Sequence, residues 1–515
     1  MSPRILWADD EIELLRPHIL FLESKGYEVT SVSNGSDAID KVKSEPFEMV
    51  ILDEQMPGMG GLETLAEINR LTPELPVVMI TKSEEERIME EALGRKISDY
   101  LTKPVNPSQV LLTCKRILDR NRLQSRTISQ DYLQSFNKIT SALTDRLGHE
   151  EWVDLYRELV RFDLDLDGDD GVRQILEDQY REANRVFGKY VEDSYENWIA
   201  DGRADDRPTM SQEIVAERVF PLLGKGKPVV FFVIDCMRYD QWLMFEQLLF
   251  PLFEITTSFY YSLLPTATPY SRNAIFSGML PSQMAKKYPK LWAEGEEDEH
   301  SRNRDEELLL TDLLKRSRVD ARLKYEKIIG SADGREFAQN VHSFTQFDLS
   351  AVVVNFVDIL AHSRSDSAVL KEIAPDEKAY RALTRTWFEH SWLFQALQTL
   401  RAADATIVLT TDHGAIRSLH PTKVIGDRQT STALRYKYGR NLKCDKRHAI
   451  FVRDPEKYGL PVTSLNTNYI IAKEDYYFVY PTNYNQYSNK YRDSLQHGGA
   501  SLEEMILPFV QLKAK

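Results

Sequence analysis

The C-terminal part of the sequence carries acidic and histidine residues in positions that suit a metal site. Three runs of β-branched or aromatic residues stop at such a residue: VVFFVID at Asp235, VVVNFVD at Asp358 and TIVLTTDH at Asp412 and His413. Buried parallel strands have near-continuous apolar runs of this kind, and open α/β sheets bind ligands at the carboxyl ends of their strands. We therefore expect a site for two divalent metal ions at one sheet edge, with hydrolysis as its chemistry.

Two further histidines can complete this site. His362 follows Asp358 by four residues, a spacing that puts both side chains on one face of a helical turn. His497 stands in the segment LQHGGASLEE, and the two glycines that follow it permit tight approach of the backbone to the metals. Carboxylates and imidazoles in this combination are typical of zinc sites.

A hydroxyl nucleophile is available in the same region. In PTATPYSRNAIFSG, a turn of small residues presents Thr266, Thr268 and Ser271 and then leads into a helix. The N-terminal amides and the dipole of that helix suit an anion, and a nearby metal ion would favour the alkoxide form of a threonine. The residues alone leave open which of the three hydroxyls attacks.

The N-terminal region alternates short apolar runs with amphipathic segments, the βα pattern of a parallel sheet. Four of these runs end in polar residues, at Asp9 and Asp10, at Asp53, at Thr81 and at Lys103. Each residue alone is typical of a strand cap or a turn. Together, three carboxylates can hold Mg²⁺ while a lysine and a hydroxyl steady a phosphoryl group.

This order of residues resembles the receiver domain of response regulators over about residues 3–122. The resemblance implies that Asp53 is the phospho-acceptor. It also implies Mg²⁺ ligands at Asp9, Asp10, Asp53 and the Gln55 carbonyl, phosphoryl contacts at Thr81 and Lys103, and a switch aromatic at Tyr100. The loop MPGMGG after the acceptor fits the family as well.

The middle of the chain is charged and has the periodicity of helices. Segments 129–147, 150–162 and 171–202 place aromatic and aliphatic residues three or four positions apart. We expect a small helical bundle that separates the N-terminal and C-terminal domains. No helix-turn-helix with a basic recognition helix is apparent in the sequence, so a DNA-binding output is not expected.

The order of the C-terminal ligand residues is similar to that of the alkaline phosphatase superfamily, and PTATPYSRNAIFSG and HGGASLEEMILP resemble the PglZ domain. By that pattern one zinc ion is bound by Asp235, Asp412, His413 and the nucleophile, and a second by Asp358, His362 and His497. Related nucleotide pyrophosphatases/phosphodiesterases place the nucleophile at the position of Thr268, with Thr266 as the alternative here and Ser271 as a weaker one. The turn lacks the cysteine or serine of the sulfatase C/S-x-P-x-R pattern, which argues against sulfate esters.

The expected fold class is a multidomain α/β protein. It consists of a (βα)5 receiver at 1–122, a helical bundle linker at 123–205 and an α/β alkaline-phosphatase-like domain at 206–515. The 515 residues carry a net charge of −14, so a general attraction to nucleic acid or to anionic membranes is not expected. The three cysteines form no CxxC pair. Without a signal peptide or a long apolar run, we expect a cytoplasmic protein with no membrane insertion.

Two segments bear on the substrate. RYKYGRNLKCDKRH (435–448) holds six lysines or arginines, and EDYYFVYPTNYNQYSNKY (474–491) holds six tyrosines. Basic groups that follow phosphates and aromatic rings that stack on bases are typical of sites for single-stranded nucleic acid. The alternative is that the tyrosines are strand and core residues and the basic groups are solvated loop charge.

The complete order of the three domains resembles a family of response regulators tied to type IX secretion and gliding motility. The resemblance implies a cognate sensor histidine kinase, zinc-dependent phosphodiesterase action on cyclic or linear oligonucleotides, and a homodimer on phosphorylation of Asp53. The rival hypothesis is a signalling scaffold, in which the metal domain binds a sigma factor or a secretion-system component and hydrolysis is vestigial.

Overall fold

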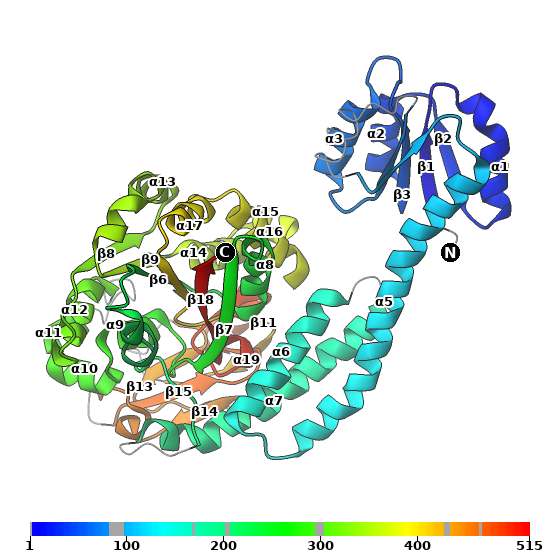
Figure 1. Cartoon of the computed structure of the whole chain (residues 1–515). Coiled ribbons are helices and arrows are strands. Elements are labelled where there is room, and N and C mark those ends of the chain that lie inside the picture. Colours follow the sequence, from blue (N-terminus) through cyan, green and yellow to red (C-terminus); the bar gives the residue numbers. More distant parts are fainter. Residues whose placement is uncertain are drawn as a thin grey trace. The chain divides into compact units, whose positions relative to one another are not determined.

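The structure is a computed structural model. It describes residues 3–81, 97–166, 170–200, 206–293, 303–426, 433–462 and 466–515. The chain divides into two compact units, of which the first comprises Met1–Gln134 with Leu166–Gly168 and the second comprises Ser135–Asp165 with Asp169–Lys515. The α/β fold class expected from the apolar runs is confirmed, with a parallel sheet in the first unit and a mixed sheet in the second (Figure 1).

The first unit is built on a parallel sheet whose order, among the described residues, is β2-β1-β3-β4-β5. Its strands are β1 Arg4–Ala8, β2 Glu28–Val32, β3 Met49–Asp53, β4 Val77–Thr81 and β5 Asp99–Thr102, with helices η1 Ile12–Leu15, α1 Arg16–Ser24, α2 Gly35–Ser44 and α3 Gly61–Leu71. Successive side chains of a strand point to opposite faces. Ile5 and Trp7 therefore pack into one buried core, and Leu6 and Ala8 pack into the other.

Three long helices form the middle of the chain: α5 Pro107–Thr144, α6 His149–Asp165 and α7 Asp170–Ile199. The boundary expected between residues 122 and 123 falls inside α5, so the chain passes from the receiver into the linker without a break in the helix. Helices α6 and α7 pack through aromatic contacts such as that of Trp152 with Phe187, whose ring centroids are 5.2 Å apart. Both helices belong to the same compact unit as the C-terminal domain.

The C-terminal domain contains a sheet of order β7-β18-β10-β6-β9-β8 within the described residues. Its strands are β6 Val229–Ile234, β7 Phe253–Tyr261, β8 Leu323–Ile328, β9 Leu349–Val354, β10 Thr406–Thr410 and β18 Ile506–Ala514. Strands β8, β9, β6 and β10 pair in parallel, whereas β18 pairs antiparallel with β10 and β7. The carboxyl ends of β9, β6 and β10 are therefore neighbours, as the apolar runs predicted.

Helices cover both faces of this sheet. Phe231 of β6 contacts Phe276 of α9, and the next residue, Phe232, contacts Phe337 of α13. Because neighbouring residues of a strand point to opposite faces, α9 and α13 lie on opposite sides of the sheet. The helices are α8 Tyr239–Leu249, α9 Thr268–Ser277, α10 Pro281–Lys287, α11 Pro289–Ala293, α12 Glu306–Arg316, α13 Ser331–Asn340, α14 Phe356–Asp366, α15 Ala368–Ile373, α16 Glu377–Glu389 and α17 Trp392–Ala402.

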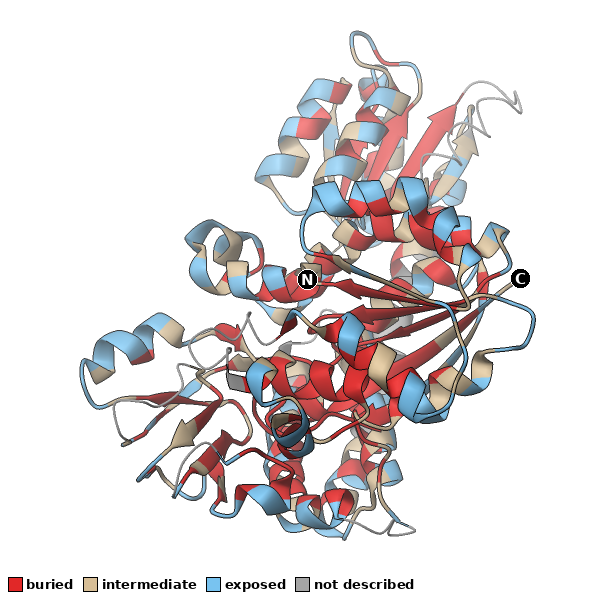
Figure 2. Cartoon of the chain, turned by 90° about the vertical axis from the view of Figure 1, so that its left-hand side faces the viewer, coloured by how far each residue is buried: buried red, intermediate tan, exposed pale blue. Residues whose placement is uncertain are grey.

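Smaller elements complete the domain. They are the strands β11 Ile416–Ser418, β12 His420–Lys423, β13 Tyr436–Gly439, β14 Ala449–Val452, β15 Asn468–Ala472, β16 Tyr476–Val479 and β17 Ser494–Gln496, the helices α18 Tyr484–Tyr491 and α19 Leu502–Met505, and the short turns η2 Val215–Val219, η3 Phe220–Leu222, η5 Val341–Gln346 and η6 Pro455–Tyr458. The central strands β6 and β9 are buried along their whole length, whereas the edge strands β7 and β8 carry exposed and partly exposed residues (Figure 2). None of the described helices has the length and apolar character needed to cross a membrane.

Candidate metal centre

Two clusters of acidic and histidine side chains lie beyond the carboxyl ends of β6, β9 and β10. In the first cluster, Asp235 follows β6, and Asp412 and His413 follow β10; all three side chains are buried. Their ligand atoms lie within 4.8 Å of one another. His413 Nε2 lies 3.6 Å from Asp235 Oδ1 and 3.7 Å from Asp412 Oδ2.

The second cluster joins α14 to the residue after β17. His362 Nε2 lies 3.4 Å from Asp358 Oδ1, and His497 Nε2 lies 3.8 Å from the same oxygen. The prediction that a strand runs up to Asp358 is wrong, because β9 ends at Val354 and Asp358 lies in the first turn of α14. The helical spacing of Asp358 and His362 is confirmed. The His413 and His497 rings stack with centroids 4.3 Å apart, so the two clusters adjoin.

Some carboxylate oxygens of the clusters accept hydrogen bonds from the protein, and others point into the clusters without a donor among the described residues. Asp412 Oδ1 accepts the N–H groups of Cys236 and His413 at 3.3 and 3.1 Å. In contrast, Asp235 Oδ1, Asp358 Oδ1 and Asp412 Oδ2 are buried and accept no hydrogen bond from the described residues. Buried carboxylate oxygens without a donor are costly, and all three face imidazoles across gaps of 3.4–3.8 Å. The donor set and these oxygens fit divalent metal ions that accept nitrogen and oxygen ligands.

The titration of these groups agrees with sites that need added positive charge. Burial raises the pKa of Asp235 to about 7 against the opposing charge of Arg272, and burial also raises the pKa of Asp412. The nearby Asp358 carboxylate, 3.4 Å from His362 Nε2, raises the pKa of His362 to about 9. Burial lowers the pKa of His413. A bound cation would favour ionised carboxylates and neutral imidazoles, reversing the pKa shifts of Asp235, Asp412 and His362.

Of the three candidate hydroxyls, Thr268 faces the clusters. It begins α9, and its Oγ1 lies 3.0 Å from His413 Nε2. Thr266 is buried and donates to the Gly499 carbonyl at 2.7 Å, and Ser271 Oγ lies 2.9 Å from Ser262 Oγ. Among the described residues, neither Thr266 nor Ser271 makes a hydrogen bond to a cluster side chain, and each has a structural partner of its own.

Two local expectations need correction. The first turn of α9 does not offer a row of free amides, because Pro269 has no N–H and the N–H groups of Tyr270 and Ser271 both donate to the Ala267 carbonyl at 2.9 Å. The helix therefore offers an anion its dipole rather than several donors. The glycines after His497 make room for the side chains of Tyr436 and Arg435, not for the expected close approach to the metals. Gly498 has φ +112°, and a Cβ on Gly499 would lie 2.2 Å from the Arg435 guanidinium.

Sequence reasoning missed Arg272, which is buried beside the first cluster. Its Nη1 lies 2.6 Å from Asp235 Oδ2 and 3.8 Å from Asp412 Oδ2, and its Nε lies 2.8 Å from Glu306 Oε1. A signal was available, since Arg272 follows Thr268 by four residues and so shares its face of the helix. Glu306 gave no comparable signal, because it is distant in sequence from every other residue of the site.

The basic and tyrosine-rich segments contain both buried structural residues and exposed residues that could contact a substrate. Arg435 is buried and pairs with Glu504 at 2.6 Å, and Lys437 is buried beneath the ring of Tyr480. Tyr477 is buried and donates to the Ser488 carbonyl at 2.5 Å. These three residues are structural. The exposed members of the two segments are Arg440, Asn441, Lys443, Lys446, Arg447 and Tyr487, among others.

In the first unit, the acidic cluster has its own cation. Asp9 follows β1, Asp53 ends β3, and the Lys103 ammonium lies 3.0 Å from Oδ2 of each. Asp10 is exposed and completes a group of three acids within 4.8 Å. Burial raises the pKa of Asp53, opposed by the hydrogen bond from Lys103.

The other predicted receiver residues lie around this cluster. Thr81 ends β4, and its hydroxyl donates to the Glu54 carboxylate rather than to an acid of the cluster. Tyr100 lies in β5 and is 40% exposed. Gln55 lies two residues beyond the end of β3, and its carbonyl as a metal ligand stays a prediction.

Helix α7 of the linker contacts two loops of the metal centre. The Leu264 N–H, in the turn before Thr268, donates to the Tyr195 hydroxyl at 2.8 Å. The Asn184 side chain accepts the Leu502 N–H at 2.8 Å and donates to Glu503 at 3.1 Å. A Cβ on Gly414 would lie 1.9 Å from the Glu503 carbonyl, so this segment packs directly against the residue after His413.

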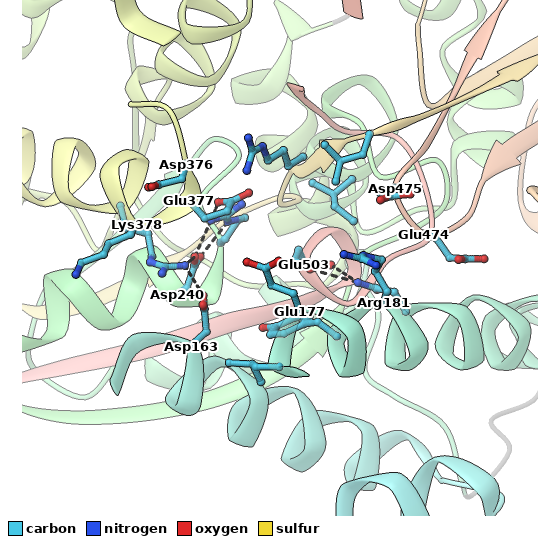
Figure 3. A pocket seen from close by; sticks show the side chains of 18 of the residues that line it. Asp163, Glu177, Arg181, Asp240, Asp376, Glu377, Lys378, Glu474, Asp475 and Glu503 are labelled. Carbon is cyan, nitrogen blue, oxygen red and sulfur yellow. Dashed lines mark hydrogen bonds and ion pairs between the residues drawn. The ribbon is translucent and has the colours of Figure 1, made fainter. Parts of the chain in front are cut away.

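Glu503 also lines a separate cavity of about 330 Å³ between the linker helices and the C-terminal domain (Figure 3). Charged side chains line it, including Asp163, Asp240 and Arg381, and Arg381 pairs with both acids at 2.5 and 3.2 Å. None of the predicted zinc ligands is among its described lining residues.

Comparisons with known proteins assign a family to each part of the chain. Residues 214–512 match the BREX system PglZ alkaline phosphatase-like domain, 5–115 match the response regulator receiver domain, and 122–199 match the PorX response regulator linker domain. The receiver resembles the transcriptional regulatory protein CpxR homolog of Haemophilus influenzae, with 35% identity over 27% of this chain and 60% of the relative. BaeR of Escherichia coli is 35% identical over 25% of this chain and 54% of its own length.

The matches to these regulators therefore span little more than half of their length. A CheY-like receiver structure from Methanospirillum hungatei is 30% identical, covering 23% of this chain and 96% of its own, with a TM-score of 0.23. The receiver implies phosphorylation-dependent regulation by a histidine kinase, and the PglZ match indicates a hydrolase of the alkaline phosphatase superfamily. The chain belongs to the PglZ alkaline phosphatase-like family, and its receiver, linker and PglZ domain follow in the order of a PorX-like response regulator.

Proposed function

We propose that the C-terminal domain is a zinc-dependent phosphodiesterase with Thr268 as its nucleophile. The observation that carries the proposal is the Thr268 hydroxyl, 3.0 Å from His413 Nε2 and beside buried carboxylate oxygens that lack donors. In this proposal Asp235, Asp412, His413 and Thr268 hold one zinc ion, and Asp358, His362 and His497 hold the other. Bound zinc would supply the positive charge that favours the threonine alkoxide and offsets charge on the phosphoryl oxygens.

The residues of the chain divide the reaction into two displacements. Thr268 Oγ1 gives up its proton to solvent and forms a bond to phosphorus while the bond to the departing ester oxygen breaks. The departing oxygen takes up a proton, and a water molecule then attacks the phosphorus and restores the Thr268 hydroxyl. The half-buried position of Thr268 at the start of α9 admits a phosphate ester from solvent and directs the helix dipole toward it.

We propose cyclic or linear oligonucleotides as the substrates. The exposed basic residues of 440–447, together with Tyr487 stacked on Tyr491, support this choice, because they can contact phosphates and bases. The structural roles of Arg435, Lys437 and Tyr477 reduce the number of groups available for that purpose.

We further propose that a PorY-like sensor histidine kinase phosphorylates Asp53, that Mg²⁺ at Asp9, Asp10, Asp53 and the Gln55 carbonyl assists, and that phosphorylation promotes a homodimer. Thr81 and Lys103 would contact the phosphoryl group, and Tyr100 would respond to it. The linker match supports a role in type IX secretion and gliding motility.

The direct test replaces Thr268 by valine, which keeps the shape of the side chain and removes the hydroxyl. In zinc-loaded protein, we expect hydrolysis of bis-nitrophenyl phosphate and of short oligonucleotides to fall by at least about 10³-fold. Thr268→Ser is the matched control, because it retains a hydroxyl and should retain measurable turnover. Unchanged turnover in Thr268→Val would exclude this nucleophile, and normal secretion in cells carrying it would favour the scaffold hypothesis.

A further inference from the structure

Arg272 is a fully buried cation that touches the metal centre from outside. It lies on α9, one helical turn beyond Thr268, and 1% of its surface is exposed. Its Nη1 is 2.6 Å from Asp235 Oδ2, the oxygen that faces away from His413. The other oxygen, Oδ1, is the one that lies 3.6 Å from His413 Nε2 and accepts no hydrogen bond from the described residues.

On the side away from Asp235, Arg272 faces a second group of buried polar side chains. Its Nε lies 2.8 Å from Oε1 of Glu306, which begins α12 and is fully buried. The other Glu306 oxygen accepts the Tyr325 hydroxyl at 2.7 Å and the Lys327 ammonium at 3.2 Å, both from β8. Asp235, Arg272, Glu306 and Lys327 thus form a continuous chain of alternating charge from β6 through α9 and α12 to β8.

A contribution to folding stability alone does not explain why these four charged residues are buried together. Transfer of charged groups out of water is costly, and apolar side chains of similar volume often fill such a space at equal or lower free energy. The same guanidinium is 3.8 Å from Asp412 Oδ2, so it also offsets the repulsion between the two carboxylates of the first cluster. One helix therefore fixes both the Thr268 hydroxyl and the orientation of Asp235.

We propose that Arg272 is a positioning residue: it holds Asp235 by Oδ2 so that Oδ1 is directed to the metal ion, while Glu306 balances the charge of the guanidinium from the other side. The inference rests on the proposed metal function of the site. Groups that orient metal ligands in this way commonly contribute about 10–100-fold to metal affinity.

The test measures zinc affinity by competition with a chelating dye, together with the thermal midpoint of each protein, so that neither readout depends on substrate. Arg272→Met should weaken zinc binding at the first site by about 10–100-fold. Glu306→Gln retains the contact between Arg272 and Asp235 and is expected to stay within about threefold of the wild type. Arg272→Lys keeps the charge but has a single donor group for two carboxylates, and it should fall between the two.

The double variant Arg272→Met/Glu306→Gln separates positioning from simple charge pairing. It also removes the glutamate charge that Arg272→Met deprives of its guanidinium, while Lys327 can still donate to the amide oxygen. The thermal midpoint of the metal-free protein should therefore recover relative to Arg272→Met while zinc affinity stays weak. Recovery of wild-type zinc affinity in the double variant would overturn the inference, and so would unchanged affinity in Arg272→Met. Loss of turnover without any loss of zinc would contradict Arg272 as a positioning residue but leave the phosphodiesterase proposal standing. A wild-type protein that binds no zinc would overturn both.

Discussion

The receiver and the C-terminal domain both gather acidic side chains at the carboxyl ends of parallel strands, but they balance the charge differently. In the receiver, the Lys103 ammonium lies 3.0 Å from both Asp9 and Asp53. In the C-terminal domain, Arg272 contacts Asp235 from outside the cluster, and Asp358 faces the imidazoles of His362 and His497 at 3.4 and 3.8 Å. The receiver cluster thus has a lysine between its carboxylates, whereas imidazoles take that place in the C-terminal clusters.

This difference matches two kinds of chemistry. An acidic cluster with its own lysine remains tolerable without an added ion, so that an ion and a phosphoryl group can come and go. Clusters of buried carboxylates and imidazoles favour ions that stay bound and help a hydroxyl nucleophile. The receiver site therefore suits a transient covalent signal, and the C-terminal site suits repeated turnover.

The largest expected effect is that one substitution abolishes hydrolysis alone and another abolishes phosphorylation alone. Asp412→Asn removes a charged ligand from the C-terminal centre, and we expect hydrolysis to fall by about 10³-fold or more with loss of bound zinc. Phosphorylation of Asp53 by a small phosphodonor should be unchanged in this variant. Activity assays, metal analysis and phosphate-affinity electrophoresis measure these three quantities.

Asp53→Asn is the reverse variant, because it removes the phospho-acceptor and retains the side-chain shape. It should take up no phosphoryl group and show no phosphodonor-dependent dimer in light scattering, yet keep the hydrolysis of the unphosphorylated protein. If Asp53→Asn alone abolished hydrolysis, the two sites would not be chemically separate.

Metal removal should affect the two units unequally. Zinc at 1,000 times its dissociation constant stabilises the form that binds it by about 4 kcal/mol, so a strong chelator should raise amide hydrogen exchange in peptides near Asp235 and Asp412. Exchange in receiver peptides near Asp53 should change little, since Lys103 already balances that cluster. Equal deprotection of both units would contradict the charge comparison.

A smaller effect concerns Glu503, beside the cavity between the linker and the C-terminal domain. Burial raises its pKa to about 7 from an ordinary value of 4.5, against the opposing hydrogen bond of Asn184. Between these values the folded protein binds more protons than the unfolded chain, so the free energy of unfolding falls as pH rises, by at most about 3 kcal/mol. Glu503→Gln should remove this slope, and the difference between the two proteins in urea unfolding from pH 5 to 8 measures it. A parallel slope in both proteins would refute the assignment.

The strands and the residues at their carboxyl ends could be predicted from the sequence, except at the end of β9. The strands, and the candidate ligands just beyond them at Asp235 and Asp412, could be placed because buried parallel strands have long apolar runs. The end of β9 was misplaced because the apolar run VVVNFVD continues through the first turn of a helix. Val357 is buried there like the strand residues, so hydropathy does not distinguish the two.

The contacts of the site with distant segments could not be predicted. Glu306 and Arg272 meet only because α12 packs on α9, and no local pattern records that contact. The same holds for α7, which reaches the turn before Thr268 through Tyr195 and the segment after His497 through Asn184. Periodicity predicted a helical linker, but it could not show that α7 of this linker packs against the candidate metal centre.

The smallest expected effect concerns the contact between α7 and the turn that carries Thr268. Tyr195→Phe leaves the buried Leu264 N–H without its acceptor, at 2.8 Å in the native protein, and should lower the free energy of unfolding by about 1–2 kcal/mol. Because the turn carries Thr268, hydrolysis should fall several-fold with zinc affinity retained. Tyr261→Phe is the matched control, since its hydroxyl donates to the His149 carbonyl of the same linker, also at 2.8 Å, and its removal leaves the acceptor of the Leu264 N–H in place. Similar loss of stability in both variants, with loss of turnover only in Tyr195→Phe, would identify α7 as a positional support of the nucleophile. Equal loss of turnover would reduce its role to general stability.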